Sequence, residues 1–341
     1  MGDKIEPNIP KSVQKPKLLV ITGPTAVGKS AVAVQLARAF GAEIISADSM
    51  QIYRGMDIGT GKISPGEAMG VPHHLIDIVA PDAPYSVGNF ITDARAIIGQ
   101  LYAQGKSIIV SGGTGLYINA LVNGYNLAGA GHSEAVRARC REKAAREGNG
   151  ALYAELAARD SESAAKISPN DQKRLIRALE ILELTGEAKS ARAKASGSGR
   201  EFDVLTIVLA CEREKLYDKI NRRVDSMLGN GLEREVERLL PYRDCQSMQA
   251  IGYKEFVGYF DGRASYAQTV GAVKQHSRNY AKRQMTFFRS MPAGVRNEEL
   301  GVRSEELGVR GQFQNAFGGK LCIDAEDGQA VFDAVKRFFA K

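Results

Sequence analysis

A segment near the N-terminus, residues 23–30 with the sequence GPTAVGKS, has the spacing of a phosphate-binding loop. Glycines let such a loop turn tightly, so that consecutive backbone N–H groups point at one anion, and the following helix adds the positive end of its dipole. Lys29 supplies a full positive charge, and the Ser30 hydroxyl is an oxygen ligand for Mg²⁺. We therefore expect a phosphate site with Mg²⁺ as cofactor and Ser30 as metal ligand, formed by Gly23, Pro24, Thr25, Ala26, Val27, Gly28, Lys29 and Ser30.

The loop alone does not identify the phosphate compound. A nucleoside triphosphatase usually has a second apolar strand that ends in Asp and holds Mg²⁺. Here the apolar run at 107–110 continues as Ser-Gly-Gly, and Asp77 is a weak substitute. Asp48 follows another apolar run, and the carboxyl ends of parallel strands face the ligand crevice. Its position leaves three roles equally open: Mg²⁺ ligand, ribose ligand and general base.

An arginine in the segment REKLYDKINRRVDSML is predicted to point inward. Helical spacing puts Arg223 against a stripe of apolar residues, whereas Arg222 lies with the charged residues of the wet face. A buried guanidinium without a partner is costly, so Arg223 needs an anion. A structural ion pair and a second clamp on the same phosphate both satisfy this need. The stripe consists of Tyr217, Ile220, Val224, Met227 and Leu228.

Positive charge is concentrated near the C-terminal part of the chain. Residues 264–292 contain five Lys or Arg and no Asp or Glu, and Lys274, Arg278 and Lys282 recur every four residues. Such a helix face suits contact with a nucleic-acid backbone, as does the net charge of +7. Lys173, Arg174 and Arg177 would make a second contact. Either set by itself is also compatible with an ordinary solvated face.

Short apolar runs and helical patterns alternate in the parts of the chain that carry these residues. Runs at 17–23, 42–49, 107–110 and 202–211 predict buried strands, and residues 29–41 predict a helix that stops at glycine. This order predicts an α/β fold, a P-loop NTPase-like parallel sheet flanked by helices. Residues 129–199 lack strand signals and predict an all-helical insertion of three helices, at 133–148, 151–167 and 170–186.

The expected organisation has a flexible lead-in at 1–15, an α/β core at 16–128 and 200–341, and the helical insertion at 129–199. Two near-identical heptads, NEELGVR and SEELGVR, are too few for a repeat fold, and we interpret 295–318 as a mobile insertion. The chain has four widely spaced cysteines without a Cys-x-x-Cys pair. It has no apolar stretch of about 20 residues. These features predict a cytoplasmic protein with no membrane contact, and we expect a monomer.

Seven segments resemble, in order, the motifs of the bacterial tRNA dimethylallyltransferases, also called tRNA isopentenyltransferases. The resemblance runs from about residue 17 to residue 289, and seven ordered motifs are far more specific than a phosphate loop alone. Phe288 stands where the family often has Trp, and His73 and His74 match a motif without evident chemistry. The segments are GPTAVGKS, IISADSMQIYRGMDIGTGK, VPHHLIDI, SGGTGLY, NDQKRLIRALEI, QAIGYKE and YAKRQMTFFR.

The resemblance implies that the loop, although it is an ATP-binding motif, holds dimethylallyl diphosphate. The dimethylallyl group would go to N6 of the adenosine 3′-adjacent to the anticodon (tRNA position 37), giving N6-isopentenyladenosine and pyrophosphate. Lys29, Arg223 and the loop would stabilise the pyrophosphate. Asp48 would take the N6 proton, and Thr25 would contact the bridging oxygen. The base must leave the anticodon stack.

The resemblance also implies a set of residues that meet the tRNA anticodon stem-loop, in both the core and the helical insertion. They are Asp48, Ser49, Met50, Gln51, Thr114, Arg137, Lys173, Arg174, Leu175, Ile176, Arg177, Gln249, Ala250, Ile251, Gly252, Tyr253 and Lys254, and to them we add Arg278, Lys282 and Arg283 of the basic run.

Two other functions fit part of the sequence. A P-loop kinase of a small metabolite would need an acidic Mg²⁺ partner, and it leaves the acid-free basic run unexplained. A non-catalytic RNA-binding module related to ATPases leaves Asp48 and the inward Arg223 without a role.

Overall fold

The computed structural model describes residues 15–124, 131–191, 201–291, 321–324 and 328–340. The chain divides into two compact units, one of residues 1–122 with 201–341 and one of residues 123–200. The segments at 1–14 and 295–318, for which we expect a flexible lead-in and a mobile insertion, lie outside the described residues. None of the helices in the described ranges is both long enough and apolar enough to cross a membrane.

The larger unit is built on a parallel sheet that has six strands within the described residues, in the order β3-β2-β4-β1-β5-β6. β1 lies between β4 and β5, with Leu19 opposite Ile109 and Leu205. The strands are β1 (Lys17–Thr22), β2 (Ala42–Ser46), β3 (His73–His74), β4 (Ser107–Gly112), β5 (Asp203–Ala210) and β6 (Leu321–Asp324). The predicted parallel α/β sheet is therefore confirmed.

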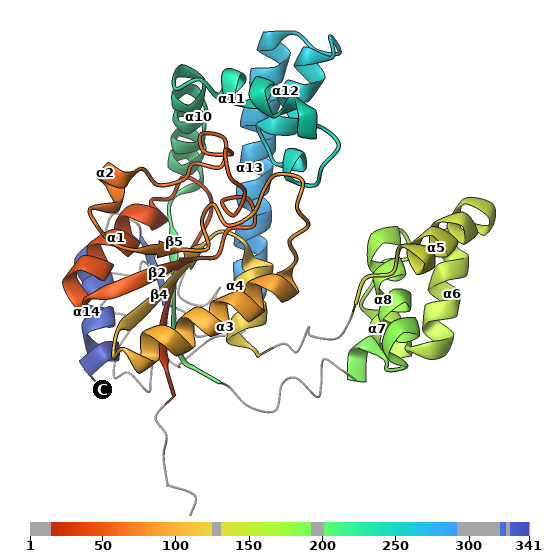
Figure 1. Cartoon of the computed structure of the whole chain (residues 1–341), viewed down its shortest axis with the longest axis horizontal. Helices are drawn as coiled ribbons and strands as arrows, with labels where there is room; N and C mark the ends of the chain where they lie inside the picture. The colour runs from red at the N-terminus through yellow and green to blue at the C-terminus, as the bar shows by residue number, and fades with distance from the viewer. Residues whose placement is uncertain (1–14, 125–130, 192–200, 292–320, 325–327, 341) are drawn as a thin grey trace, which may run out of the picture. The chain divides into compact units, whose positions relative to one another are not determined.

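Helices cover both faces of this sheet (Figure 1). α1 and α14 pack on one face, in a core that joins Val34 and Val335 to Ile21 and Ile207. α3 and α4 cover the other face, where Phe90 stacks on Tyr117. The helices of this unit are α1 (Lys29–Phe40), α2 (Pro65–Ala68), α3 (Val87–Ala103), α4 (Gly115–Val122), α10 (Arg213–Gly229), α11 (Leu232–Leu239), η1 (Leu240–Tyr242), η2 (Ser247–Gln249), α12 (Tyr253–Phe260), α13 (Tyr266–Ser290) and α14 (Gly328–Ala340).

Glycines let several chain segments converge at the carboxyl edge of the sheet. Gly28, at φ 101°, turns the phosphate loop into α1, and Gly41, at φ 61°, ends that helix. At Gly112 a Cβ atom would lie 2.2 Å from the backbone oxygen of Ala47. The backbone at the end of β4 therefore packs directly against the backbone that follows β2. The loops that follow β1, β2 and β4 therefore lie together at one edge, as expected for a parallel α/β sheet.

The sequence does not predict β3. β3 consists of His73 and His74, which lack the apolar run that predicts a buried strand. His74 Nε2 lies 2.7 Å from Glu43 Oε2, and His73 Nδ1 lies 2.8 Å from the backbone oxygen of Val71. These contacts give both histidines structural partners at the edge of the sheet.

The smaller unit is helical throughout its elements, which are α5 (Glu134–Glu147), α6 (Asn149–Arg159), α7 (Ser161–Ala165) and α8 (Gln172–Thr185). Its core joins Cys140, Leu152, Leu156 and Leu179. The sequence predicted three helices, and the second of them, at 151–167, is divided into α6 and α7. The extra division occurs at Asp160, because its carboxylate accepts the Ser163 N–H and so begins a new helix.

Candidate active site

A cavity of about 350 Å³ lies in the larger unit, at the carboxyl edge of the sheet. One wall is the phosphate loop with Thr25, Lys29 and Ser30, and the opposite wall comes from α10, α13 and the segment around residue 250. The lining includes residues 48–51, 59–61 and 111–113, together with Arg223, Gln249, Ala250, Ile251, Gly252, Lys254, Tyr280, Arg283 and Gln284. Residues far apart in sequence thus share one site.

Lys29 is held at the cavity by its own loop. Its Nζ donates to the Pro24 backbone oxygen at 2.8 Å. Burial, helped by the nearby charge of Arg223 and opposed by Asp48, lowers the pKa of Lys29 to about 7. Desolvation and a neighbouring cation both disfavour the charged form, so an anion bound here would be stabilised strongly.

Arg223 points into the same cavity from α10, as the helical spacing predicted. Burial lowers its pKa, while Asp48 and Glu67 act in the opposite direction. Its Nη2 donates to the Thr60 backbone oxygen at 3.5 Å. Within the described ranges, no carboxylate forms an ion pair with this guanidinium. This favours the interpretation that Arg223 binds an anion from outside the chain over the interpretation that it forms a structural ion pair.

Asp48 and its neighbours are brought together with Thr114 by the crossing of two loops. Asp48 Oδ1 accepts the Met50 N–H at 2.9 Å, and the Ser49 N–H donates to Thr114 Oγ1 at 2.9 Å. Ser46 Oγ donates to Gln51 Oε1 at 3.0 Å. Asp48 lines the cavity with Lys29 and Arg223, so the carboxylate and the two cations surround one volume.

Gln284 is a site residue that the sequence interpretation did not single out. Its Oε1 accepts the Thr25 N–H and its Nε2 donates to the Gly113 oxygen, each at 2.9 Å. This buried amide therefore joins α13 to the phosphate loop and to the end of β4. No local signal distinguishes Gln284 in the sequence, because its partners lie 259 and 171 residues away.

Tyr280, on the same face of α13, closes the cavity near Asp48. Burial, reinforced by the charge of Asp48, raises the pKa of Tyr280, so its hydroxyl stays protonated. The Arg283 guanidinium lies 5.7 Å from the centre of the Tyr280 ring. This distance is within the range of a cation–π contact, so the two side chains support each other beside the cavity.

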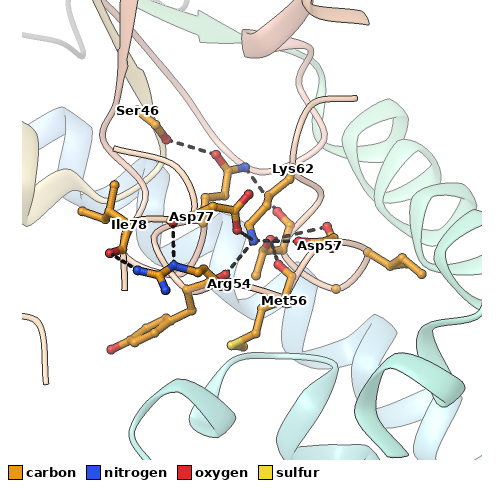
Figure 2. Close-up of polar contacts among 12 residues, drawn as sticks. Ser46, Arg54, Met56, Asp57, Lys62, Asp77 and Ile78 are labelled. Carbon is orange, nitrogen blue, oxygen red and sulfur yellow. Dashed lines mark hydrogen bonds and ion pairs between the residues drawn. The ribbon is translucent and has the colours of Figure 1, made fainter. Parts of the chain in front are cut away.

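A buried lysine fastens the segment that carries Asp48 (Figure 2). Lys62, whose side chain is 6% exposed, donates to the Tyr53 oxygen at 2.6 Å and pairs with Asp57 at 2.7 Å and with Asp77. Arg54 donates to the Asp77 and Ile78 oxygens at 3.1 and 3.0 Å. Asp77 is thus held by Lys62, which argues against its use as the Mg²⁺ ligand of the cavity.

The structure corrects several expected nucleic-acid contacts. Leu175 and Ile176 are 0% and 7% exposed in the core of the helical unit, and Tyr253 is 0% exposed. Their side chains therefore pack the protein and are not available to a tRNA. Lys173 and Arg174, by contrast, are exposed.

Some of the basic side chains of α13 already have partners within the protein. Lys274 pairs with Asp225 of α10 at 2.6 Å, and Arg278 donates to Asn221 and Gln275 at 2.7 Å each. Lys282 and Arg283 are exposed. Asp225 and Asn221 lie on α10 and Gln275 lies on α13 itself, so a count of charges along one helix overestimates the number of donors that this face offers.

In the helical unit, Arg137 and Arg177 are occupied by a buried acid. Glu180 is 0% exposed and accepts from Arg137 Nε at 2.8 Å, from Arg177 Nη1 at 2.6 Å and from the Ser133 N–H at 2.9 Å. Burial would raise the pKa of Glu180, but these hydrogen bonds outweigh it and lower the pKa to about 2. The two arginines therefore stabilise this unit, and any contact with nucleic acid uses donors left over from that role.

The residues present fit a Mg²⁺ ion held mainly by substrate phosphates. No group of three or more His, Cys, Asp or Glu side chains with metal-binding geometry occurs in the described ranges. Ser30 and Asp48 nevertheless both offer oxygen atoms to the cavity. Mg²⁺ commonly binds through one or two protein oxygens plus phosphates and water.

Comparison with known proteins identifies similar chains. Residues 51–291 match the family model described as IPP transferase, and residues 16–81 match isopentenyl transferase. The tRNA dimethylallyltransferase of Geobacillus thermodenitrificans is 49% identical over 276 residues, 80% of this chain and 88% of the relative. The enzyme of that name from Bacillus subtilis is 46% identical over 278 residues, 81% of this chain and 88% of the relative.

Solved structures of tRNA-modifying transferases are also similar to this chain. The tRNA isopentenylpyrophosphate transferase of Bacillus halodurans superposes with a TM-score of 0.66 at 37% identity and covers 96% of this chain and 98% of its own. A eukaryotic dimethylallyltransferase acting on tRNA has a TM-score of 0.74 at 28% identity, covering 91% of this chain and 74% of its own.

Proposed function

This chain belongs to the tRNA dimethylallyltransferase (IPP transferase) family, and from that premise we propose that it prenylates tRNA. The donor is dimethylallyl diphosphate, and the acceptor is N6 of the adenosine 3′-adjacent to the anticodon. The products are N6-isopentenyladenosine and pyrophosphate. The catalytic residues are Lys29, Thr25, Arg223 and Asp48, all of which line one cavity.

One observation supports this proposal above the others. Lys29 and Arg223 are two buried cations that face the same cavity, and neither forms an ion pair with a carboxylate among the described residues. Arg223, and Lys29 in its protonated form, share this volume with the single carboxylate of Asp48, so an anion bound beside the phosphate loop would be stabilised. The diphosphate of the donor supplies this anion. Its binding brings C1 of the attached dimethylallyl group toward Asp48, which lines the same cavity.

The reaction follows from these positions. The bond between C1 of the dimethylallyl group and the bridging oxygen breaks as a bond from N6 to C1 forms, and the N6 proton passes to the Asp48 carboxylate. Negative charge develops on the departing pyrophosphate, where the loop N–H groups, Lys29 and Arg223 stabilise it. Mg²⁺ held by Ser30, when bound, would neutralise further charge on the phosphate oxygens.

The orientation of Thr25 depends on α13. Gln284 Oε1 accepts the Thr25 N–H at 2.9 Å and so holds the backbone of Thr25 beside the cavity, where its hydroxyl would contact the bridging oxygen of the donor. Residues 249–252 and Lys254 lie across the cavity and form the acceptor side, with Tyr280 and Arg283 beside them.

The direct test separates this function from that of a kinase. The protein is incubated with unmodified tRNA and Mg²⁺, with either dimethylallyl diphosphate or ATP plus candidate metabolites, and the nucleosides are analysed by mass spectrometry. We expect N6-isopentenyladenosine only with the prenyl donor. Absence of this nucleoside, or phosphate transfer from ATP at a comparable rate, would overturn the proposal.

A variant tests the base. Asp48→Asn keeps the shape of the side chain and its hydrogen bond to Met50 but removes the proton acceptor. We expect it to bind tRNA within about threefold of wild type, with turnover reduced about 10²–10⁴-fold, the usual contribution of a general base. Near-normal turnover would show that Asp48 does not take the proton.

A further inference from the structure

Glu235 of α11 is a buried carboxylate that accepts hydrogen bonds mainly from backbone N–H groups. It is 1% exposed, and it accepts the N–H groups of Asp57 at 3.0 Å, Ile58 at 2.8 Å and Gly59 at 3.0 Å. In the described part of the chain it pairs with no lysine, arginine or histidine. A carboxylate is costly to bury, so three converging N–H donors from one loop mark a specific anchoring point.

A fourth donor reaches Glu235 from the acceptor side of the cavity. The Tyr253 hydroxyl donates to Glu235 Oε1 at 2.6 Å, and burial, followed by the Glu235 charge, raises the pKa of Tyr253. The loop also rests on the tyrosine ring, since a Cβ atom on Gly59 would lie 2.4 Å from Tyr253 Cε2. Glu235 therefore joins two walls of the cavity, the loop at 57–61 and the segment at 249–254.

The other side of the same loop meets Arg223. At Gly61, with φ 60°, a Cβ atom would lie 2.0 Å from Arg223 Nη2, so the guanidinium packs directly on the backbone. The Thr60 oxygen accepts from Arg223 at 3.5 Å and from Gln51 at 3.4 Å, and the Gly61 oxygen accepts from Gln51 at 3.2 Å. A shift of this loop would therefore move Arg223 with it.

We propose that Glu235 is a positioning residue for the prenyl transfer: it holds the loop at 57–61 so that Arg223 faces the diphosphate, and through Tyr253 it ties that loop to the acceptor wall. The role of Arg223 rests on the proposed function, whereas the contacts of Glu235 do not. Glu235 touches neither substrate, and it acts through the loop.

The chemistry of the side chain defines the variants. Glu235→Gln keeps the size but replaces one acceptor oxygen by an NH₂ group, which opposes backbone N–H donors of the loop. Tyr253→Phe keeps the ring against Gly59 and removes one hydrogen bond. Glu237→Gln is the matched control, because Glu237 is an exposed residue of the same helix.

The measurement is the affinity of the full-length protein for inorganic pyrophosphate, by calorimetry, together with KM and kcat for dimethylallyl diphosphate. We expect Glu235→Gln to weaken pyrophosphate binding and raise KM about tenfold, and Tyr253→Phe about threefold, on the scale of charge-assisted hydrogen bonds. Glu237→Gln should stay within about twofold of wild type.

A double-mutant cycle with Arg223→Lys shows whether Glu235 acts through Arg223. In the Arg223→Lys background, Glu235→Gln should weaken pyrophosphate binding by less than about threefold, since the group it positions is already altered. Additive effects, or a Glu235→Gln variant that behaves like Glu237→Gln, would overturn the inference. If Glu235→Gln does not fold, Tyr253→Phe replaces it in the same cycle, with a smaller expected effect on pyrophosphate binding. Failure of wild type to bind pyrophosphate would instead overturn the proposed function.

Discussion

The shifted pKa of Lys29 makes the pH dependence of donor use a sharp prediction. Burial holds this pKa at about 7 in the free site, so the charged form that binds diphosphate is lost as pH rises through 7. The protonated fraction falls from about one half at pH 7 to about 3% at pH 8.5 for a group with this pKa. The value of kcat/KM reports groups of the free enzyme, so it should fall about 15-fold over this interval.

The assay measures kcat/KM for dimethylallyl diphosphate, at a fixed tRNA concentration far below saturation, between pH 6.5 and 9, for wild type and for Lys29→Arg. Arginine stays protonated throughout this range. The substitution should lower affinity at every pH, because the longer side chain does not fit the contact with the Pro24 oxygen, but it should abolish the decline above pH 7. Calorimetry with pyrophosphate at pH 8 should show uptake of nearly one proton, because the bound anion restores the charge of Lys29.

Two results would refute this reasoning. A wild-type profile that is flat from pH 7 to 8.5 would mean that Lys29 remains charged in the free site. A decline of equal size in Lys29→Arg would assign the titration to another group, such as the donor itself or the tRNA.

Three further predictions concern the frame around the site. Gly61→Ala should weaken pyrophosphate binding at least tenfold in calorimetry, because its Cβ would displace Arg223 and φ is 60°; an unchanged affinity would contradict the close packing. Gln284→Ala, which releases the Thr25 N–H, should lower kcat about tenfold in single-turnover assays while leaving tRNA binding unchanged, and an effect on tRNA binding alone would contradict this role. Glu180 has a pKa lowered to about 2, so the stability that it contributes is present above pH 4.5 and is lost as pH falls toward 2. Glu180→Gln should lower the melting temperature at pH 7 by several degrees and reduce its loss on acidification, followed by circular dichroism; equal melting curves would contradict it.

The parts of the site that could be predicted from sequence are those with a local signal. The phosphate loop needs only its own glycines, Lys29 and the following helix, so short-range spacing suffices. The inward direction of Arg223 follows from helical periodicity within a single segment. Asp48 follows from the rule that the carboxyl ends of parallel strands meet at one edge.

Residues whose roles depend on distant partners could not be found in this way. Gln284 acts on Thr25 and Gly113, and Glu235 acts on a loop that precedes it by more than 170 residues. Neither has a charge pattern or a spacing that distinguishes it from an ordinary polar helix residue. Their importance arises from tertiary packing, which composition and periodicity do not encode.

Two errors had a different origin. The family motif is a continuous run that contains Leu175 and Ile176, but a helix that packs on a core must bury some residues of any such run. The basic face of α13 was overestimated because Asp225 and Asn221, which contact Lys274 and Arg278, lie on another helix. In both cases the missing information was the side of the helix that meets its neighbour.

The account rests on the claim that the loop at 23–30 holds a diphosphate that leaves, and the balance of the reaction tests this directly. Pyrophosphate and N6-isopentenyladenosine are measured together, with dimethylallyl diphosphate and unmodified tRNA, in the absence and presence of ATP. We predict one pyrophosphate per modified adenosine without ATP, and only competitive inhibition when ATP is added. A requirement for ATP, or release of phosphate from ATP in step with product, would contradict the claim.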